Sequence, residues 1–154
     1  MSLLTAEEYK ERLNDGRVVY YKGERVENVA TDPNLVACVN TMAVDYEMAH
    51  DPKYKDLALV NDPELGDLVS RYYYKPKTAD DLLKAYELIV TSTAISDGYI
   101  PLAHDIGADA LNAISITANI MGNQDYIARI EAFRRYLKKE DVACCAAVTC
   151  VKGD

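Results

Sequence analysis

The sequence predicts a mainly α-helical domain with one short β-hairpin near residues 18–29. Five segments carry a helix-start signal or apolar residues at helical spacing, near 5–13, 32–50, 78–96, 104–122 and 123–139. A single pair of β-prone runs, Val18 to Tyr21 and Arg25 to Val29, flanks Lys22-Gly23. Gly23 suits a tight hairpin turn because glycine adopts positive φ at little cost.

Local capping signals define the helices. Thr5 and Glu8 fit a capping box, as do Thr78 and Asp81, and Asp32-Pro33 predicts a helix start with Asp32 as the cap. We expect the inward faces to carry the apolar residues of each period. These are Val36, Val39, Met42, Ala43, Tyr46 and Ala49, then Leu82, Leu83, Tyr86, Ile89 and Val90, then Ile127, Ile130, Phe133, Tyr136 and Leu137. Residues 51–77 are interpreted as a long loop with a short helix or two.

Length and charge restrict the class of protein. The 154 residues suit one domain, 1–154, and 17 Lys and Arg against 25 Asp and Glu give a net charge of −8. An acidic surface repels phosphate backbones, so we expect no nucleic-acid partner. No apolar run approaches the roughly 20 residues of a membrane span, and no signal peptide is visible. The expected compartment is the cytoplasm, without membrane contact.

The cysteines favour packing over metal binding. Cys144, Cys145 and Cys150 crowd into one apolar run, Cys38 stands apart, and no CxxC pair occurs. We expect the three clustered residues to be buried and structural.

Few residues have the types and spacing of a catalytic motif. The sequence has no phosphate-binding loop, dinucleotide fingerprint, nucleophile elbow or HExxH motif. His50 fits a structural role at a helix C-terminus. His104 next to Asp105 is open to two interpretations, an acid–base pair or a helix cap beside a histidine. Gly98 and Pro101 make this segment irregular, which favours binding roles.

Several blocks resemble one flavoenzyme family. TAEEYKERLNDGRVVYYKGERVENVATDP resembles the opening of 4-hydroxyphenylacetate 3-monooxygenases, and VNTMAVDYEMAHDPKYKDL, TADDL, GADALNA and KGD resemble 4-hydroxybutyryl-CoA dehydratases. These two enzyme groups form one family with an acyl-CoA dehydrogenase-like fold. The resemblance runs from about Thr5 to Asp154. It implies that this chain is the N-terminal helical domain of a longer, three-domain enzyme.

The resemblance also implies a cofactor and partners. The complete enzyme is expected to bind FAD between its other two domains, so no FAD is expected on this chain alone. The implied partners are a phenolic or acyl-CoA substrate, the remaining domains and further copies in a homo-oligomer. The implied activity is hydroxylation of a phenol or transformation of a CoA ester. The alternative is a non-catalytic, stand-alone helical interaction module.

Two departures from the family bear on the site. The dehydratases supply two cysteines to an iron–sulfur cluster just before the GxDAxNA block. Here those positions fall on Pro101 and Asp105, or on Tyr99 and Ala103 with a shifted gap, so no cluster is expected. The arginine with which the monooxygenases hold the phenol is also missing. The resemblance therefore points to His104 as the acid–base residue, with Tyr99, Asp105 and Asn112 binding substrate.

Overall fold

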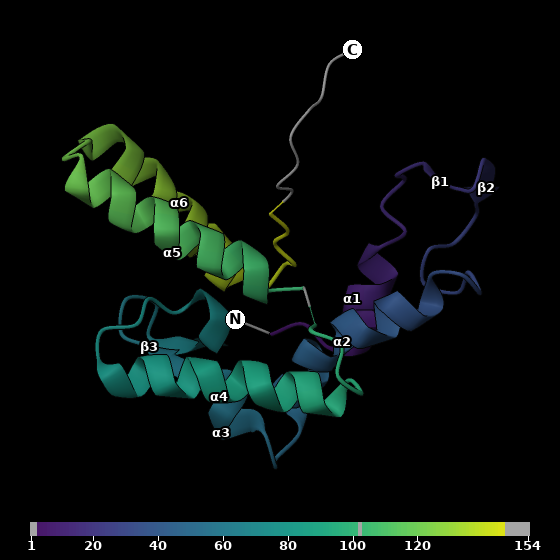
Figure 1. Ribbon diagram of the computed structural model, residues 1–154, viewed down its shortest axis with the longest axis horizontal. Coiled ribbons are helices and arrows are strands. Elements are labelled where there is room, and N and C mark those ends of the chain that lie inside the picture. The colour runs from purple at the N-terminus through teal and green to yellow at the C-terminus, as the bar shows by residue number, and fades with distance from the viewer. Residues whose placement is uncertain (1–2, 102, 147–154) are drawn as a thin grey trace.

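The computed structural model describes residues 3–101 and 103–146 of the chain. Within them the elements follow the order α1 (Ala6–Arg12), β1 (Val19–Tyr21), β2 (Glu24–Val26), α2 (Val36–His50), α3 (Lys55–Ala58), β3 (Leu59–Asp62), β4 (Asp67–Ser70), the 3₁₀ helix η1 (Arg71–Tyr73), α4 (Ala79–Ile95), α5 (Asp105–Ile120) and α6 (Gln124–Glu140). Figure 1 shows three limbs: the α5–α6 hairpin, α4 with α3 and β3, and α1 with α2. The limbs meet near the middle of the molecule.

The predicted mainly α-helical fold with a hairpin near 18–29 is confirmed. β1 and β2 pair antiparallel, with Val19 opposite Val26 and Tyr21 opposite Glu24. Lys22 and Gly23 have φ values of 51° and 87°, so both turn residues are left-handed. Such a turn matches the right-handed twist of the strands that it joins.

The capping boxes are confirmed, whereas the start of α2 differs from the prediction. Thr5 and Thr78 each accept a hydrogen bond from the backbone N–H three residues on, with Glu8 and Asp81 bonding back. Asp32 does not begin a helix. Its carboxylate accepts from the Asn34 N–H at 2.8 Å and closes a turn, and α2 starts at Val36.

The segment interpreted as a loop contains a second antiparallel hairpin, β3–β4, with Leu59 opposite Ser70. Its strands have four residues each, and their apolar residues stand in adjacent pairs, Leu59-Val60 and Leu68-Val69, so the alternation that would reveal it in sequence is absent. The buried Arg71 fastens it to α3, because its guanidinium donates to the carbonyls of Leu57 and Leu59 at 2.5 and 2.8 Å. A buried ion pair between Lys138 and Asp62, 2.6 Å apart, joins it to α6.

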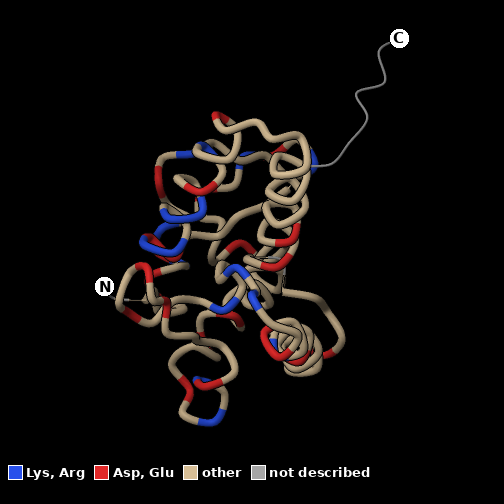
Figure 2. The backbone as a smooth tube through the Cα atoms, turned by 90° about the vertical axis from the view of Figure 1, so that its left-hand side faces the viewer, with Lys and Arg blue, Asp and Glu red and all other residues tan. Residues whose placement is uncertain are grey.

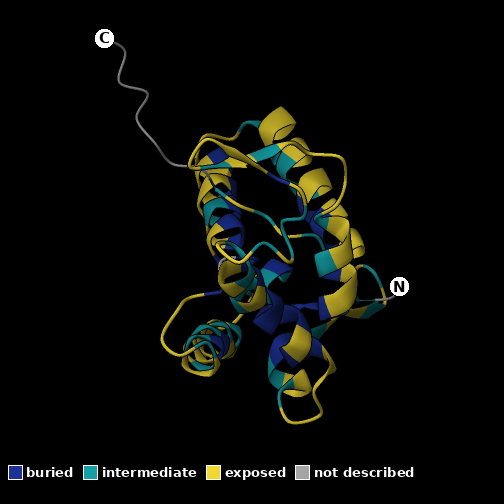
Figure 3. Cartoon of the chain, turned by 90° about the vertical axis from the view of Figure 1, so that its right-hand side faces the viewer, coloured by how far each residue is buried: buried dark blue, intermediate teal, exposed yellow. Residues whose placement is uncertain are grey.

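The core lies where the limbs meet (Figure 3). One apolar cluster joins α1 and α2 and includes Ala103, a second joins α2, α3, β3 and α4, and a third joins η1, α5 and α6. The outer faces of the helices are exposed in the same view. The fold therefore concentrates burial at the junction of the limbs.

Parts of two predicted apolar faces lie outward. On α4 the side chains of Leu82, Leu83, Tyr86 and Val90 are exposed, and on α6 those of Phe133 and Tyr136 are exposed. On α4 the buried positions belong to Leu88 and Ser92, which were not predicted. On α6 the predicted Leu137 is buried, together with Arg134 and Lys138, and the predicted Ile127 and Ile130 are half-buried. The expectation of burial was wrong there because several apolar residues on one face do not specify what covers that face.

Charged residues of both signs are scattered along the backbone, between longer stretches of other residues (Figure 2). Within the described ranges, no helix has both the length and the apolar character needed to cross a membrane.

Candidate functional site

His104 lies at the junction of the limbs, immediately before α5, and is only 2% exposed. Three tyrosine rings enclose its imidazole. Tyr72 stacks on it at 5.7 Å between centroids, Tyr73 meets it edge-on at 5.2 Å, and Tyr46 is tilted at 4.8 Å. This aromatic cage fixes the plane of the ring.

Hydrogen bonds fix the rotation of the same ring. His104 Nδ1 lies 3.1 Å from Asp45 Oδ2, and the other Asp45 oxygen accepts from the Tyr72 hydroxyl at 3.2 Å. The Tyr72 hydroxyl also lies 3.2 Å from Ser92 Oγ. Because Asp45 is a buried carboxylate, these polar partners replace the water that it loses on folding. The four residues come from α2, η1, α4 and the segment before α5.

Asp141 completes the junction from the far side of His104. Its Oδ1 lies 3.7 Å from His104 Nε2, and its Oδ2 accepts from the Leu4 N–H at 3.1 Å. Asp141 has a left-handed φ of 49°, which turns the chain where α6 ends. Burial raises the pKa of this carboxyl, whereas His104 and the Leu4 N–H oppose the rise. Asp141 therefore joins the N-terminal segment to the segment that leaves α6.

Asp105, the first residue of α5, differs from its neighbour. It is 8% exposed and forms no hydrogen bond or ion pair with any residue that the structure describes. Burial raises the pKa of its carboxyl to about 6, and the nearby charges of Asp109 and Asp45 add to the rise. Such a group exchanges a proton near neutral pH, which is the property that acid–base chemistry needs.

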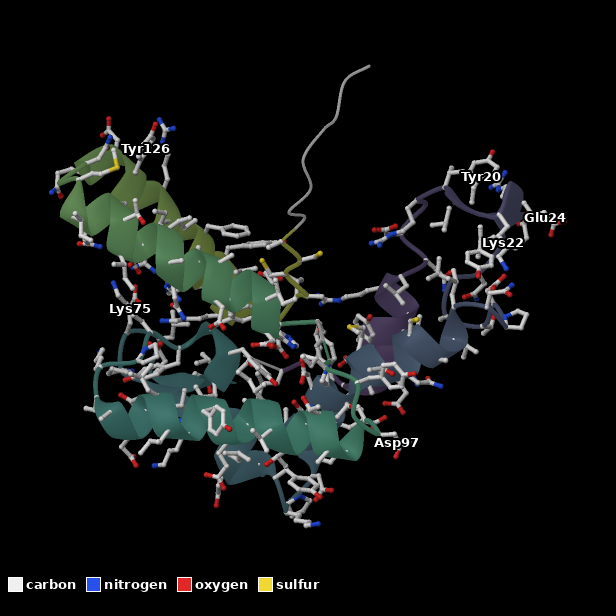
Figure 4. All side chains as sticks on the ribbon, in the orientation of Figure 1. Tyr20, Lys22, Glu24, Lys75, Asp97 and Tyr126 are labelled. Carbon is white, nitrogen blue, oxygen red and sulfur yellow. The ribbon has the colours of Figure 1, made fainter. Side chains whose placement is uncertain are left out.

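Asn112 lies two helical turns after Asp105 on the same face of α5. It is half-buried and lines a cavity of about 500 Å³ between α5 and the start of α4, together with Lys75, Thr78 and Ser115. Figure 4 shows Lys75 between the α5–α6 hairpin and the limb of α4. Its ammonium lies 3.0 Å from Glu131, so its charge is paired.

Tyr99 lies apart from these groups. Its side chain is 72% exposed, after Asp97 and Gly98 with φ values of 54° and 91°. Figure 4 shows Asp97 at the end of α4. The structure thus brings His104 and Asp105 to the junction, places Asn112 further along α5, and leaves Tyr99 pointing outward.

Gly107 allows the segment after α6 to touch α5. A Cβ atom at Gly107 would lie 1.9 Å from the Cys144 carbonyl oxygen, and the Cys144 N–H donates to the Ala103 carbonyl at 2.7 Å. The thiols there are less buried than expected: Cys144 is half-buried, Cys145 is exposed, and Cys150 lies outside the described residues. The expectation of burial was wrong for Cys145 because the run lies against only one helix face.

The expectation that no iron–sulfur cluster binds near the start of α5 rests on the sequence. The two pairs of positions at which the family's cysteines fall carry no thiol, and such clusters bind mainly thiolates. Among the described residues no group of three or more His, Cys, Asp or Glu could hold a metal ion.

Sequence reasoning missed four members of the junction, which are Asp45, Tyr72, Ser92 and Asp141. One signal was available for Asp45, since within the apolar run of α2 it lies three residues after Met42 and four before Ala49, on the same helix face. A carboxylate in such a run needs a buried partner. No local signal marks Ser92 or Asp141, because their roles arise only when distant segments meet.

Comparison with known proteins identifies a family match and several relatives of this chain. A family model described as 4-hydroxyphenylacetate 3-hydroxylase N terminal matches residues 5–154. The 4-hydroxybutyryl-CoA dehydratase/vinylacetyl-CoA-Delta-isomerase of Clostridium aminobutyricum is 30% identical over 159 residues, which cover 99% of this chain and 31% of that protein. The 4-hydroxyphenylacetate 3-monooxygenase oxygenase component of Thermus thermophilus is 31% identical over 138 residues, covering 85% and 26%.

Solved structures agree with these relatives. A 4-hydroxyphenylacetate 3-monooxygenase oxygenase component complexed with FAD matches with a TM-score of 0.73 and 26% identity, covering 91% of this chain and 29% of that one. An archaeal 4-hydroxybutyryl-CoA dehydratase from N. maritimus matches with a TM-score of 0.79 at 22% identity, covering 91% and 28%, which shows the shared fold. The chain spans less than a third of the length of these proteins. The match over residues 5–154 shows that the chain belongs to the 4-hydroxyphenylacetate 3-hydroxylase N-terminal family.

Proposed function

We propose that residues 1–154 form the N-terminal, substrate-side domain of a longer, three-domain FAD-dependent enzyme that hydroxylates a phenolic substrate. Relatives whose names state a monooxygenase activity support this proposal. So does a solved relative in complex with FAD and 4-hydroxyphenylacetate. The apolar faces of α4 and α6 that are exposed here would then pack against the remaining domains.

The carboxyl group of Asp105 carries the proposal. The residue is 8% exposed and no described residue bonds its carboxylate, so a hydrogen-bond donor from outside this set of residues can bind there. A substrate hydroxyl provides such a donor. In the proposed role, Asp105 accepts the phenolic proton at a carboxylate oxygen while Asn112 binds the substrate further along α5. Bound FAD would supply the oxidation–reduction chemistry.

The other two predicted site residues take different parts in the proposal. His104 is enclosed by three tyrosines, so we give it a positioning role that holds the start of α5 in place. Tyr99 is free to contact substrate or another domain because its side chain is exposed. The acid–base role thereby moves from His104 to the neighbouring Asp105.

A second candidate function is the transformation of an acyl-CoA. The match to the Clostridium aminobutyricum dehydratase favours it, because that match covers 99% of this chain. The lack of thiols just before the GxDAxNA block argues against a cluster-dependent reaction. Hydroxylation of a phenol therefore ranks first.

The test compares two acids one turn apart on α5 in the full-length enzyme. Asp105→Asn removes the proposed base, whereas Asp109→Asn removes an exposed acid on the same helix. With reduced FAD and a phenol, we expect Asp105→Asn to lower turnover by about 100-fold and to remove a titration near pH 6. Asp109→Asn should keep turnover at neutral pH and move the titration to lower pH, because the Asp109 charge raises the pKa of Asp105. Equal turnover for both variants would show that Asp105 is not the base.

A further inference from the structure

The cavity between α5 and the start of α4 is lined by a second polar side chain of α5 besides Asn112. Ser115 lies one turn after Asn112 and is only 3% exposed. Its hydroxyl forms no hydrogen bond with any described residue, whereas the Thr117 hydroxyl on the same helix donates to the Ala113 carbonyl at 3.0 Å. The Ser115 hydroxyl keeps some accessible surface, so a molecule in the cavity can reach it. Such a nearly buried hydroxyl gains from a partner.

Asn112 offers the same kind of chemistry. Its side chain is half-buried, and its carboxamide bonds to no residue of the described ranges. Residues three apart on a helix are neighbours on one face, so Asn112 and Ser115 lie side by side. A carboxamide and a hydroxyl are both neutral, and each provides a donor and an acceptor. Together they suit a ligand group that also donates and accepts.

The charges around the cavity are compensated. The Lys75 ammonium pairs with Glu131 at 3.0 Å. The Lys77 N–H donates to the Asp81 carboxylate at 2.9 Å, so a negative charge lies close to that lysine, and its ammonium lies 5.8 Å from the centre of the Tyr74 ring. A charged ligand group would lose its water without meeting a free opposite charge. The cavity therefore favours a neutral polar group over a carboxylate.

The remaining walls and the spacing along α5 define the rest of the ligand. The other lining side chains are apolar, namely Pro76, Ala79, Leu82 and Ile116. Asn112 lies seven residues after Asp105, which is about 10.5 Å along a helix. A para-hydroxyphenyl ring with a two-carbon side chain has about this length when a hydrogen bond of ~2.8 Å is added at one end.

We propose that this cavity binds the end of the substrate's side chain and that this end is a neutral carboxamide, held by Asn112 and Ser115. The inference rests on the proposed function, in which the phenolic hydroxyl of the same molecule bonds to Asp105. The Ser115 hydroxyl donates to the carboxamide oxygen, and Asn112 accepts from the carboxamide N–H. The substrate class is then a para-hydroxyphenyl compound with a short amide side chain, in contrast to the 4-hydroxyphenylacetate held by a solved relative.

The test compares two ligands of nearly equal shape and different charge. Binding of 4-hydroxyphenylacetamide and 4-hydroxyphenylacetate to the full-length protein with FAD is measured by calorimetry at pH 7.5. We expect the amide to bind at least about tenfold more tightly, because only the amide both donates and accepts without bringing a charge. The compound 4-ethylphenol, which has the same length and no polar end, should bind about tenfold more weakly than the amide.

Variants assign the preference to the cavity. Ser115→Ala should weaken binding of the amide about three- to tenfold, and Asn112→Leu at least about tenfold. Ser115→Ala should leave the affinity for 4-ethylphenol within about twofold. Thr117→Val removes a hydroxyl from the same helix outside this cavity and should change neither affinity. Because the Ser115 hydroxyl is unpaired, Ser115→Ala should melt at the same temperature as the parent or higher, which excludes unfolding as the cause.

Binding and turnover separate this inference from the proposed function. Equal or tighter binding of the carboxylate, or full affinity of Ser115→Ala for the amide, would overturn the inference even if the protein hydroxylates phenols. Preferred binding of the amide that depends on Ser115, without hydroxylation in the presence of reduced FAD, would support the cavity's specificity and contradict the proposed reaction. Absence of binding by all three phenols would overturn the inference.

Discussion

The junction around His104 and the outer faces of α4 and α6 differ in the kind of side chain that they bury or expose. At the junction, buried Asp45 bonds His104 Nδ1 and buried Asp141 accepts from the Leu4 N–H, and these partners come from segments far apart in the sequence. On the outer faces, large apolar side chains such as Leu83 and Tyr136 remain exposed. This difference indicates that the buried polar contacts of the junction determine how the segments pack together. The exposed apolar faces are suited to contacts with residues outside the described ranges.

The largest expected effect comes from breaking the junction. Asp45→Ala removes the partner of both His104 Nδ1 and the Tyr72 hydroxyl, leaving Nδ1 without a partner and the hydroxyl with Ser92 alone. We expect the free energy of unfolding to fall by about 3–4 kcal/mol, measured by urea denaturation. Asp109→Ala, an exposed acid on α5, serves as the control and should change it by less than about 0.5 kcal/mol. A loss below about 1 kcal/mol for Asp45→Ala would contradict the importance of the network.

A smaller but clear effect is expected where the chain crosses α5. Gly107→Ala places a methyl group 1.9 Å from the Cys144 carbonyl oxygen, so the segment after α6 must move. We expect a loss of about 2–3 kcal/mol despite the better helix propensity of alanine. Ala113→Ser changes an exposed position of the same helix and should be nearly neutral. A stable Gly107→Ala protein with an unchanged melting temperature would show that the crossing is loose.

How far the sequence predicts this structure depends on whether the signal is local. Thr5, Thr78 and Gly23 act on residues within a few positions, and the predicted caps and turn are present. The second hairpin has a local turn signal in Asp62-Pro63 and Gly66, but its strands are too short to show alternation, and its position depends on Arg71 reaching the carbonyls of Leu57 and Leu59. Long-range contacts of this kind leave no periodic pattern in the sequence.

The candidate site also has a part that the sequence predicts and a part that depends on long-range contacts. The family motif located the segment around His104 and Asp105, yet the two side chains differ in surroundings for reasons that adjacency does not reveal. His104 points among three tyrosines from α2 and η1, whereas Asp105 begins α5 without a partner among the described residues. Apolar residues at helical spacing also predicted that Leu82 and Phe133 are buried, but both are exposed. The spacing identifies an apolar helix face and does not identify the segment that packs against it.

Titration of Asp105 gives a third and more moderate prediction. Its folded pKa of about 6 exceeds the usual value of roughly 4, so the folded state binds this proton more tightly than the unfolded chain. The residue therefore lowers stability progressively as the pH rises from about 4 to about 6. Asp105→Asn removes this loss. We expect the variant to be more stable than the parent by about 1–2 kcal/mol near pH 7 and equal to it near pH 4, as measured by urea denaturation at both pH values. A variant that is less stable at both would indicate that the carboxylate has a partner.

The smallest effect on stability is expected on the outer face of α4, where an exposed leucine can be compared with a buried one. Leu83 is 66% exposed, so Leu83→Gln removes little buried apolar area and should change the free energy of unfolding of this chain by less than about 0.5 kcal/mol. Leu88, one and a half turns further on, is buried, and Leu88→Gln places an amide in the core, which should cost at least about 3 kcal/mol. Both variants are measured by urea denaturation under the same conditions. If Leu83→Gln cost as much as Leu88→Gln, the outer face would be covered within this chain, and its proposed role in packing against other domains would be wrong.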